Sequence, residues 1–423
     1  MRAATTPGSR PGYSRRTPIG ALVLLALAPL GALPAAAAAC EPDGVQASGA
    51  IHRICMPERW NGDLVLFAHG YVGFDQPVAI PEDQLALPDG TSLPDLVTRL
   101  GFAFATTSYS GNGLAVVQGM ADLVDLIDVF RATHAAPRRV YLTGVSEGGL
   151  ITALLTERRP DLFAGGLATC GPVGDFPRQV NHFGDFRVIF DAYFPGVIPG
   201  SPVQVPPDVI ENFFTVHTDA ILAEIRADPD RTREMLAVLR APADPAIPVE
   251  VEDTIMQLAW YNVFATNDAR SRLGGQPFDN RRRFYIGSEA DFLLNLRVER
   301  FTADAAALES MRSIYQTMGR LSIPLVTMHT LGDPVIPYWH ERAYALKTLL
   351  AGSGPRHLNI PINRYGHCAF TAPEALAAFA LLVLMAGGDV GRAAEAILAD
   401  DPGAAAAYRT MVGTHAAAAA RAR

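Results

Sequence analysis

A serine flanked by small residues stands between an apolar run and a helical pattern, and this arrangement restricts the fold more than any other feature of the chain. Residues 144–149 read Gly-Val-Ser-Glu-Gly-Gly and separate the apolar run 140–143 from a helical pattern that continues to Arg159. A serine at such a sharp turn takes a strained backbone conformation, so its neighbours must be small. The turn also puts Ser146 at a helix N-terminus, where the dipole favours developing negative charge. The sequence therefore predicts Ser146 as a nucleophile.

Short apolar runs alternate with longer helical patterns around this turn. The runs are continuous, as expected of strands covered on both faces. They occupy residues 64–68, 102–105, 140–143 and 165–169, and helical patterns occupy 114–134 and 148–159. This alternation predicts an α/β fold with a doubly wound, mostly parallel sheet.

The alternation stops after Gly171 and resumes about 150 residues later. Helical patterns and proline clusters fill the interval, and β-like runs return at 324–329 and 357–362. The helical patterns occupy residues 218–227, 232–239, 252–265 and 302–318, and a long helix is expected at 373–385. We therefore expect residues 40–171 and 321–423 to form the α/β core and residues 172–320 to form a mainly helical cap. The tail beyond Gly388 is expected to be a surface helix with a frayed end.

His367 is the best candidate for the base that a nucleophilic serine requires. A serine hydroxyl is barely ionised at neutral pH, so a neighbouring base must take its proton. His367 lies directly after the last predicted strand and before the last long helix, the third position in the chain order serine, acid, histidine. His340 and His357 are poorer candidates, because they lie inside a helical pattern and at the start of a strand.

Asp333 is expected to orient His367. It stands in a Gly-Asp-Pro turn that follows the predicted strand 324–329. A carboxylate there would hold the imidazole in the required tautomer and stabilise the imidazolium. Two alternatives remain open: Asp333 could merely close an Asx turn before Pro334, or Asp175 could be the acid instead.

Backbone N–H groups are expected to bind the oxyanion. One should come from the residue after the nucleophile and the other from the turn after an earlier strand. Glu147 supplies the first by position, and Tyr71, which follows His69-Gly70 at the end of the strand 64–68, supplies the second. The side chain of Tyr71 is incidental to this role, and the side chain of His69 is expected to brace the turn.

Together these motifs resemble the α/β-hydrolase superfamily. The His-Gly pair, the serine turn, the Gly-Asp-Pro-Val turn and Tyr-Gly-His occur in the family's order and at its topological positions. The Ser-x-Gly-Gly form is similar to that of secreted bacterial esterases and of the prolyl-oligopeptidase-like branch. The resemblance covers residues 62–171 and 323–388, and residues 172–320 occupy the place of the family's cap. It implies a serine hydrolase, but the cap resembles none of known specificity.

The first 39 residues are expected to be a signal peptide. Four arginines precede a short apolar run and five alanines. The run is shorter than the ~20 residues of a membrane span, so no stable span is expected. The alanines end at Cys40, which leaves lipidation of that cysteine as an alternative to simple export. Without the leader the chain has 31 basic residues, 35 less four, against 43 acidic ones, which argues against nucleic acid or an anionic membrane as a partner.

Four cysteines in an exported chain suggest two disulfides, for which three pairings exist. Cys40 and Cys55 bracket a hairpin-like segment and can meet locally, which leaves Cys170 for Cys368. A bridge between the latter two would pin the loop of His367. Buried free thiols are the alternative.

The cap carries many aromatic residues and the cluster Arg281-Arg282-Arg283. The aromatic residues could line an apolar cleft or simply form the core of the cap, and the arginines are better explained as a solvated cluster than as a carboxylate site. No metal-binding or phosphate-binding motif occurs, so no cofactor and no metal are implied.

We interpret the chain as a carboxylic ester hydrolase that acts outside the cytoplasm on a small-molecule or polymeric ester through an acyl-enzyme. One alternative is a serine peptidase of the prolyl-oligopeptidase type, although few residues precede the first core strand where such peptidases usually carry a propeller. Another is a non-catalytic homologue that binds a ligand or partner. Acyl specificity and oligomeric state are left open.

Overall fold

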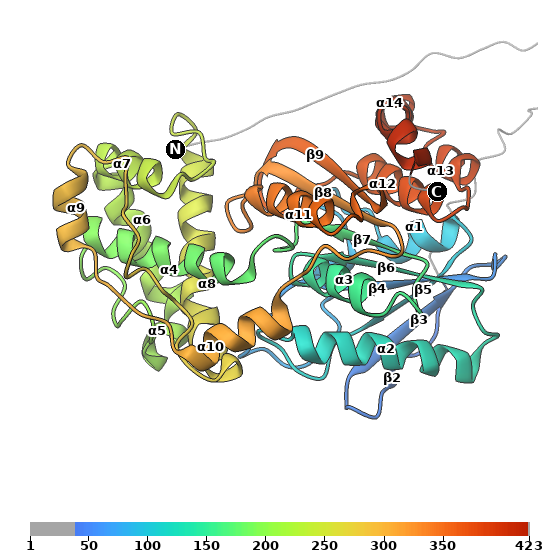
Figure 1. Cartoon of the computed structure of the whole chain (residues 1–423), viewed down its shortest axis with the longest axis horizontal. Coiled ribbons are helices and arrows are strands. Elements are labelled where there is room, and N and C mark those ends of the chain that lie inside the picture. Colours follow the sequence, from blue (N-terminus) through green and yellow to red (C-terminus); the bar gives the residue numbers. More distant parts are fainter. Residues whose placement is uncertain (1–38, 422–423) are drawn as a thin grey trace, which may run out of the picture. The chain divides into compact units, whose positions relative to one another are not determined.

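A nine-stranded sheet runs through the computed structural model, which describes residues 39–421 (Figure 1). The strands follow the order β1-β3-β5-β4-β6-β7-β8-β9, and β2 pairs with β3 outside this path. Their bounds are β1 Ala39–Cys40, β2 Gly44–Val45, β3 Ile51–Met56, β4 Asp63–Ala68, β5 Ala103–Thr107, β6 Arg139–Val145, β7 Gly165–Thr169, β8 Leu325–Gly332 and β9 His357–Tyr365. Strands β4 to β9 are parallel, and β3 is antiparallel to β5. The predicted doubly wound, mostly parallel sheet is confirmed.

The sheet is covered on both faces because its central strands are apolar at consecutive positions. In β4, Leu64 and Leu66 pack against α2 and α3, whereas Val65 packs on the opposite face with α1 and α12. Successive side chains of a strand point to opposite faces, so a strand that is apolar at every position must be packed against other elements on both faces. All six residues of β4 are buried.

The helices of the α/β core are α1 Leu93–Arg99, α2 Val116–Thr133, α3 Glu147–Arg158, α11 Trp339–Leu350, α12 Ala372–Met385, α13 Gly391–Ile397 and α14 Pro402–Arg421. Helix α12 begins with a capping box formed by Thr371 and Glu374. The tail forms α13 and α14, but α14 is more than a surface helix. It packs against α12 and buries Ala405, Tyr408 and Ala419.

A helical insertion connects β7 to β8, as predicted, and lies on the left in Figure 1. It contains α4 Phe176–Tyr193, α5 Pro207–Glu211, α6 Thr218–Ala227, α7 Pro229–Leu239, α8 Pro248–Leu273, α9 Asp291–Arg297 and α10 Ala305–Ser310, with π-helical turns at Phe213–His217 and Met311–Tyr315. Most of its aromatic residues form a core of its own, among them Phe186, Phe190, Phe194 and Phe213. The core explanation therefore holds for most of the cap aromatics.

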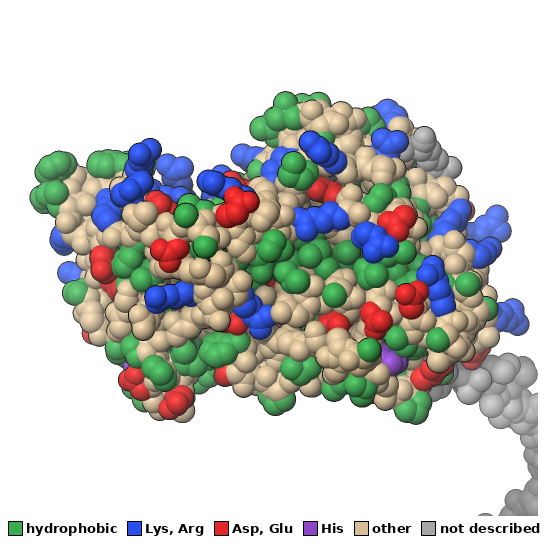
Figure 2. Space-filling model, turned by 60° about the horizontal axis from the view of Figure 1, so that its bottom comes forward, with side chains coloured by type: hydrophobic (Ala, Val, Ile, Leu, Met, Phe, Trp, Pro, Cys, Tyr) green, Lys and Arg blue, Asp and Glu red, His purple; other side chains and the backbone are tan. Residues whose placement is uncertain are grey.

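Charged residues lie mainly on the surface. On the face shown in Figure 2, basic and acidic side chains are interspersed. Arg281 and Arg282 are exposed, and Arg283 forms an ion pair with Asp185, so this cluster is solvated as expected. Within residues 39–421, no helix combines the length and the hydropathy needed to cross a membrane. The predicted signal peptide lies outside the described residues except for Ala39, which pairs with Met56.

Candidate active site

Ser146 lies at the turn between β6 and α3, in a backbone conformation that is rare for a non-glycine residue. Its φ is 54° and its ψ is −118°, which costs on the order of 1–3 kcal/mol and persists only where the surroundings enforce it. A Cβ at Gly144 would collide with the carbonyl of Gly148, and a Cβ at Gly148 would collide with the carbonyl of Ala68. The flanking glycines are therefore required by close backbone packing around the serine, as the sequence pattern indicated.

Three residues from separate loops meet at this turn. His367 Nε2 lies 3.0 Å from Ser146 Oγ, and His367 Nδ1 lies 2.7 Å from Asp333 Oδ2. Ser146 follows β6, Asp333 follows β8 and His367 follows β9. Because these strands are parallel, their carboxyl ends lie at the same edge of the sheet and bring the three side chains together. The structure thus unites all three residues predicted from the sequence.

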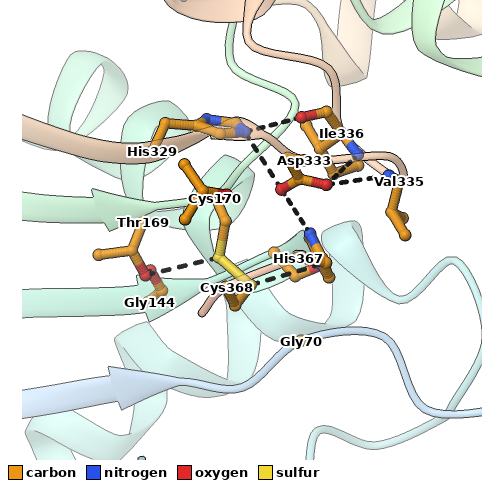
Figure 3. Close-up of a disulfide and its surroundings, with 12 residues drawn as sticks. Gly70, Gly144, Thr169, Cys170, His329, Asp333, Val335, Ile336, His367 and Cys368 are labelled. Atoms are coloured by element: carbon orange, nitrogen blue, oxygen red, sulfur yellow. Dashed lines mark hydrogen bonds and ion pairs between the residues drawn. A yellow bond between two sulfur atoms is a disulfide. The ribbon is translucent and has the colours of Figure 1, made fainter. Parts of the chain in front are cut away.

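Asp333 is buried and accepts several hydrogen bonds. Its Oδ1 accepts the N–H groups of Val335 and Ile336, both at 2.9 Å (Figure 3). Burial opposes ionisation, but the charge of His367 and hydrogen bonds from His329 and His367 outweigh it and lower the pKa of Asp333 to about 2. The Asx turn and the contact with His367 therefore coexist.

Asp175, the alternative acid, is not part of this cluster. Its side chain accepts the N–H of Arg178 at 3.1 Å and caps α4. His340 and His357 are also engaged elsewhere: His340 Nε2 meets the side-chain oxygen of Gln179 at 2.8 Å, and His357 meets the hydroxyl of Thr327.

The turn that follows β4 lies against Ser146. A Cβ at Gly70 would come within 3.1 Å of the Ser146 Cβ, so the backbone of residues 70–71 approaches the nucleophile closely. Gln84 fixes this turn, because its Oε1 accepts the N–H of Gly70 at 2.6 Å and its side-chain amide donates to the carbonyl of Tyr71. Sequence reasoning did not identify Gln84, which no motif marks.

The side chain of Tyr71 does more than predicted. Its hydroxyl donates to the carbonyl of Phe264, and its ring packs edge-on against Trp260, so it ties the turn to cap helix α8. His69 braces the same turn, since its buried ring stacks on Tyr109 and its Nδ1 donates to the carbonyl of Gly70. Burial lowers the pKa of His69 to about 4.

Glu147 provides the first backbone N–H of α3. Its side chain is buried and accepts the N–H of Ala115 at 2.7 Å. Burial raises the pKa of this carboxyl to about 8. The turns at Tyr71 and Glu147 thus flank Ser146, where an oxyanion hole would require their N–H groups.

A disulfide adjoins His367 (Figure 3). Cys170, at the end of β7, is bonded to Cys368, whose Sγ lies 3.4 Å from His367 Nε2. The second disulfide joins Cys40 to Cys55 across β1 and β3. Both pairings are those favoured by the sequence, and the free-thiol alternative is wrong for all four cysteines.

The disulfides also bear on two other possibilities. A sulfur bonded to Cys55 cannot carry a thioether-linked lipid, so the structure argues against lipidation of Cys40. Cys170, His367 and Cys368 are the one group of described residues whose donor atoms cluster closely enough for a metal ion. In the disulfide form the two sulfurs are bonded to each other, and thiolates are the form in which cysteine binds metals.

An apolar pocket of about 110 Å³ opens beside Ser146, between the core and the cap. One face of α8 borders it with Tyr261, Ala265 and Ala269, which are spaced four residues apart. Its apolar walls also include Leu114, Leu150, Phe176, Phe183, Phe278 and Ile336. Phe183 and Tyr261 are thus cap aromatics that do line a cleft.

Tyr261 brings a cap hydroxyl to the nucleophile. Its ring stacks on Phe183 with centroids 4.9 Å apart, and its hydroxyl lies near the side chain of Ser146, with which it lines the same pocket. Burial raises the pKa of Tyr261, so the hydroxyl stays protonated and able to donate. The sequence marks Tyr261 only as one of many cap aromatics, because its position depends on how the cap packs on the core.

Comparison with solved structures finds peptidases and esterases of low similarity. An acylaminoacyl peptidase from Pyrococcus horikoshii has 12% identity and a TM-score of 0.38 over 78% of this chain, and an esterase from Pyrococcus furiosus has 10% identity and 0.40 over 78% of this chain and 84% of its own. Oligopeptidase B from Leishmania major has 13% identity and 0.39 over 90% of this chain. This chain spans 37% of the length of the two peptidases. No protein-family model and no curated protein sequence matches it.

Proposed function

We propose that this chain, which has the α/β-hydrolase fold, is a serine carboxylic ester hydrolase. The observation that carries the proposal is the hydrogen-bonded series Ser146–His367–Asp333 at the mouth of an apolar pocket. A serine hydroxyl that meets an imidazole, itself held by a buried carboxylate, is the arrangement that activates serine for attack on acyl groups.

In the proposed reaction, Ser146 Oγ attacks the ester carbonyl while His367 Nε2 takes its proton. Asp333 holds the ring through Nδ1, and the N–H groups of Tyr71 and Glu147 bind the oxyanion of the tetrahedral intermediate. His367 then gives the proton to the leaving alcohol. Water, deprotonated by the same nitrogen, clears the acyl-enzyme and restores Ser146.

The composition of the pocket favours an ester with an apolar acyl group. Its walls are mainly aliphatic and aromatic. Of the residue types Asp, Glu, Lys, Arg and His, only Glu147 lines it. An uncharged acyl chain is therefore the group that the pocket suits best. The hydroxyl of Tyr261 beside Ser146 adds a donor on the cap side of the reacting centre.

Export is part of the proposal. Two disulfides with no free thiol among the described residues fit an oxidising compartment, where such bonds persist. We propose that the enzyme acts in the periplasm or outside the cell.

The test is hydrolysis of p-nitrophenyl esters with acyl chains of two to sixteen carbons, beside peptide p-nitroanilides. Wild-type protein and Ser146→Ala are compared, and thermal-unfolding curves measured on separate samples establish that both are folded. Ester turnover that is absent from the variant is the expected result. Anilide cleavage with little ester turnover would establish a peptidase instead, and a folded wild-type protein that no fluorophosphonate labels at Ser146 would indicate a non-catalytic homologue.

A further inference from the structure

We propose that His329 is a positively charged positioning residue. Its ring contacts Asp333 beside His367 and reduces the negative electrostatic potential that Asp333 exerts on the catalytic histidine. The inference rests on the proposed function of the Ser146 site. It adds a second buried ion pair, His329 with Glu341, to the hydrogen-bonded series of the catalytic residues.

His329 is fully buried in β8, and both of its ring nitrogens face acceptors; Figure 3 shows the two acceptors of Nε2. Nε2 lies 2.7 Å from the carbonyl oxygen of Ile336 and 3.3 Å from Asp333 Oδ2. Nδ1 lies 3.1 Å from Glu341 Oε1. The same carboxylate oxygen of Asp333 that meets His367 Nδ1 is thus also approached by His329.

The hydrogen bonds around the ring define its protonation. A carbonyl oxygen can only accept, so Nε2 must carry a hydrogen. Glu341 Oε2 accepts from the Thr327 hydroxyl at 2.5 Å and from the Asn359 amide at 2.6 Å, which stabilises the carboxylate form and leaves Oε1 to accept from Nδ1. With both nitrogens donating, His329 is an imidazolium.

The electrostatic surroundings of the ring also favour the imidazolium form. Burial disfavours the charged ring, but hydrogen bonds to Asp333 and Glu341, together with their charges, outweigh it and raise the pKa of His329 to about 10. Among the described residues, Asp333 thus contacts one charged ring, the ring of His367 and two backbone N–H groups.

The other histidines packed around this pair are held neutral. His340, from α11, accepts the N–H of Gly174 at Nδ1, and burial and the charge of His329 place its pKa well below the usual value. Burial also lowers the pKa of His357, on β9, and of His182, on α4. The remaining titratable neighbour is Tyr338, whose ring stands edge-on to His329 with its centroid 6.0 Å away.

A cation on Asp333 weakens the attraction between Asp333 and a proton on His367. Removing the charge of His329 strengthens proton binding at His367, and the acid limb of the pH–rate profile moves to higher pH. His329 Nε2 and His367 Nδ1 lie 3.3 Å and 2.7 Å from the same oxygen of Asp333, so they are at most about 6 Å apart. By Coulomb's law at an effective dielectric constant of about 20, one charge at that distance changes the limb by roughly two pH units.

The variant Glu341→Gln should remove the positive charge of His329 while keeping the hydrogen bonds of its ring. The carbonyl oxygen of the new amide can accept from Thr327 and Asn359, and its NH2 can donate to His329 Nδ1. That leaves the ring neutral, with a hydrogen on Nε2 for Ile336 and Asp333. Both charges of the pair disappear, but the cation is nearer to Asp333, so its loss dominates.

The experiment measures the rate constant for fluorophosphonate labelling of Ser146 against pH. It compares the wild type, Glu341→Gln and His329→Asn, with His357→Asn as the control, since His357 is a half-buried histidine nearby that does not contact Asp333. The acid limb is expected to move to higher pH by up to roughly two pH units in His329→Asn and by a smaller amount in Glu341→Gln, where the charge of Glu341 is lost as well. It should stay unchanged in the control. An unmoved limb in folded Glu341→Gln, or an equal shift in His357→Asn, overturns the proposal.

Nitrogen NMR of the wild-type protein provides a readout that needs neither labelling nor turnover. Two protonated nitrogens on His329 at pH 8 would support the proposal even if His329→Asn fails to fold. One bare nitrogen would overturn it. If the wild type does not react with the fluorophosphonate at all, the proposed function fails, while the charge of His329 is still decided by this measurement.

Discussion

Replacing Ala265 by phenylalanine should abolish the preference of the enzyme for longer acyl groups. Ala265 lies on the face of α8 that borders the apolar pocket, one turn from Tyr261. A cavity of about 150 Å³ holds the six carbons of benzene, so the 110 Å³ here holds roughly four carbons. The phenyl ring that this substitution introduces is therefore larger than the space available to the acyl chain.

The size of the effect follows from the transfer free energy of a methylene group. Each buried CH2 contributes about 0.8 kcal/mol, which is roughly a fourfold change in kcat/KM. The butanoyl group is longer than acetyl by two methylenes, so the wild type should have an about 15-fold higher kcat/KM for the butanoyl ester than for the acetyl ester. Acyl groups longer than about five carbons should raise kcat/KM little further. In Ala265→Phe this ratio should fall to about one, while turnover of the acetyl ester changes by only a few-fold.

The assay is kcat/KM for p-nitrophenyl acetate, butanoate, hexanoate and octanoate. Ala223→Phe is the control, because Ala223 is an exposed alanine on the cap helix α6 and receives the same side chain away from the pocket. Thermal unfolding of both variants checks that they are folded. A folded Ala265→Phe enzyme that keeps the 15-fold preference would refute the assignment of this pocket to the acyl group.

Three further predictions concern single contacts. Tyr261→Phe should lower kcat about tenfold, since it removes the hydroxyl near Ser146, a potential hydrogen-bond donor to the reacting group, while keeping the ring on Phe183; an unchanged kcat would contradict a role for the hydroxyl. Serine at both Cys170 and Cys368 should lower the melting temperature and kcat together, because that disulfide closes a loop of 198 residues, worth roughly 5 kcal/mol of chain entropy, and adjoins the catalytic loop; opening the other disulfide should lower only the melting temperature. The pKa of His329 is about 10 in the folded protein against 6.5 ordinarily, so the free energy of unfolding should decrease as pH rises through that interval. Urea unfolding at pH 7 and 9.5 measures this decrease, which Glu341→Gln should reduce.

The parts of the fold and site that could be predicted are those whose signal lies in consecutive residues of the sequence. Continuous apolar runs located the buried parallel strands, and the residue types that follow them identified Ser146, Asp333 and His367. The parallel order of the strands then brings the three together without further information. Such local signals are reliable because each strand end positions its own loop.

The parts that were missed depend on packing between distant segments. Helix α4 places the charged side chain of Arg187 at a fully buried position, where it bonds to Asp191 and to backbone carbonyls, so its pattern does not look amphipathic. Tyr261 reaches Ser146 only because the cap folds over the core. His329 stands inside an apolar strand, and its partner Glu341 lies on a helix that carries no motif.

The long-range disulfide also determines when the loop of His367 can be tethered during synthesis of the chain. Cys170 ends β7, but its partner follows β9, so the entire cap and two more strands must be made before the bond can form. A chain that has not yet reached an oxidising compartment lacks this tether beside His367. Maturation of the enzyme would therefore finish with the catalytic histidine. A protease that cuts within the cap of the finished protein would leave its two fragments covalently joined next to the active site.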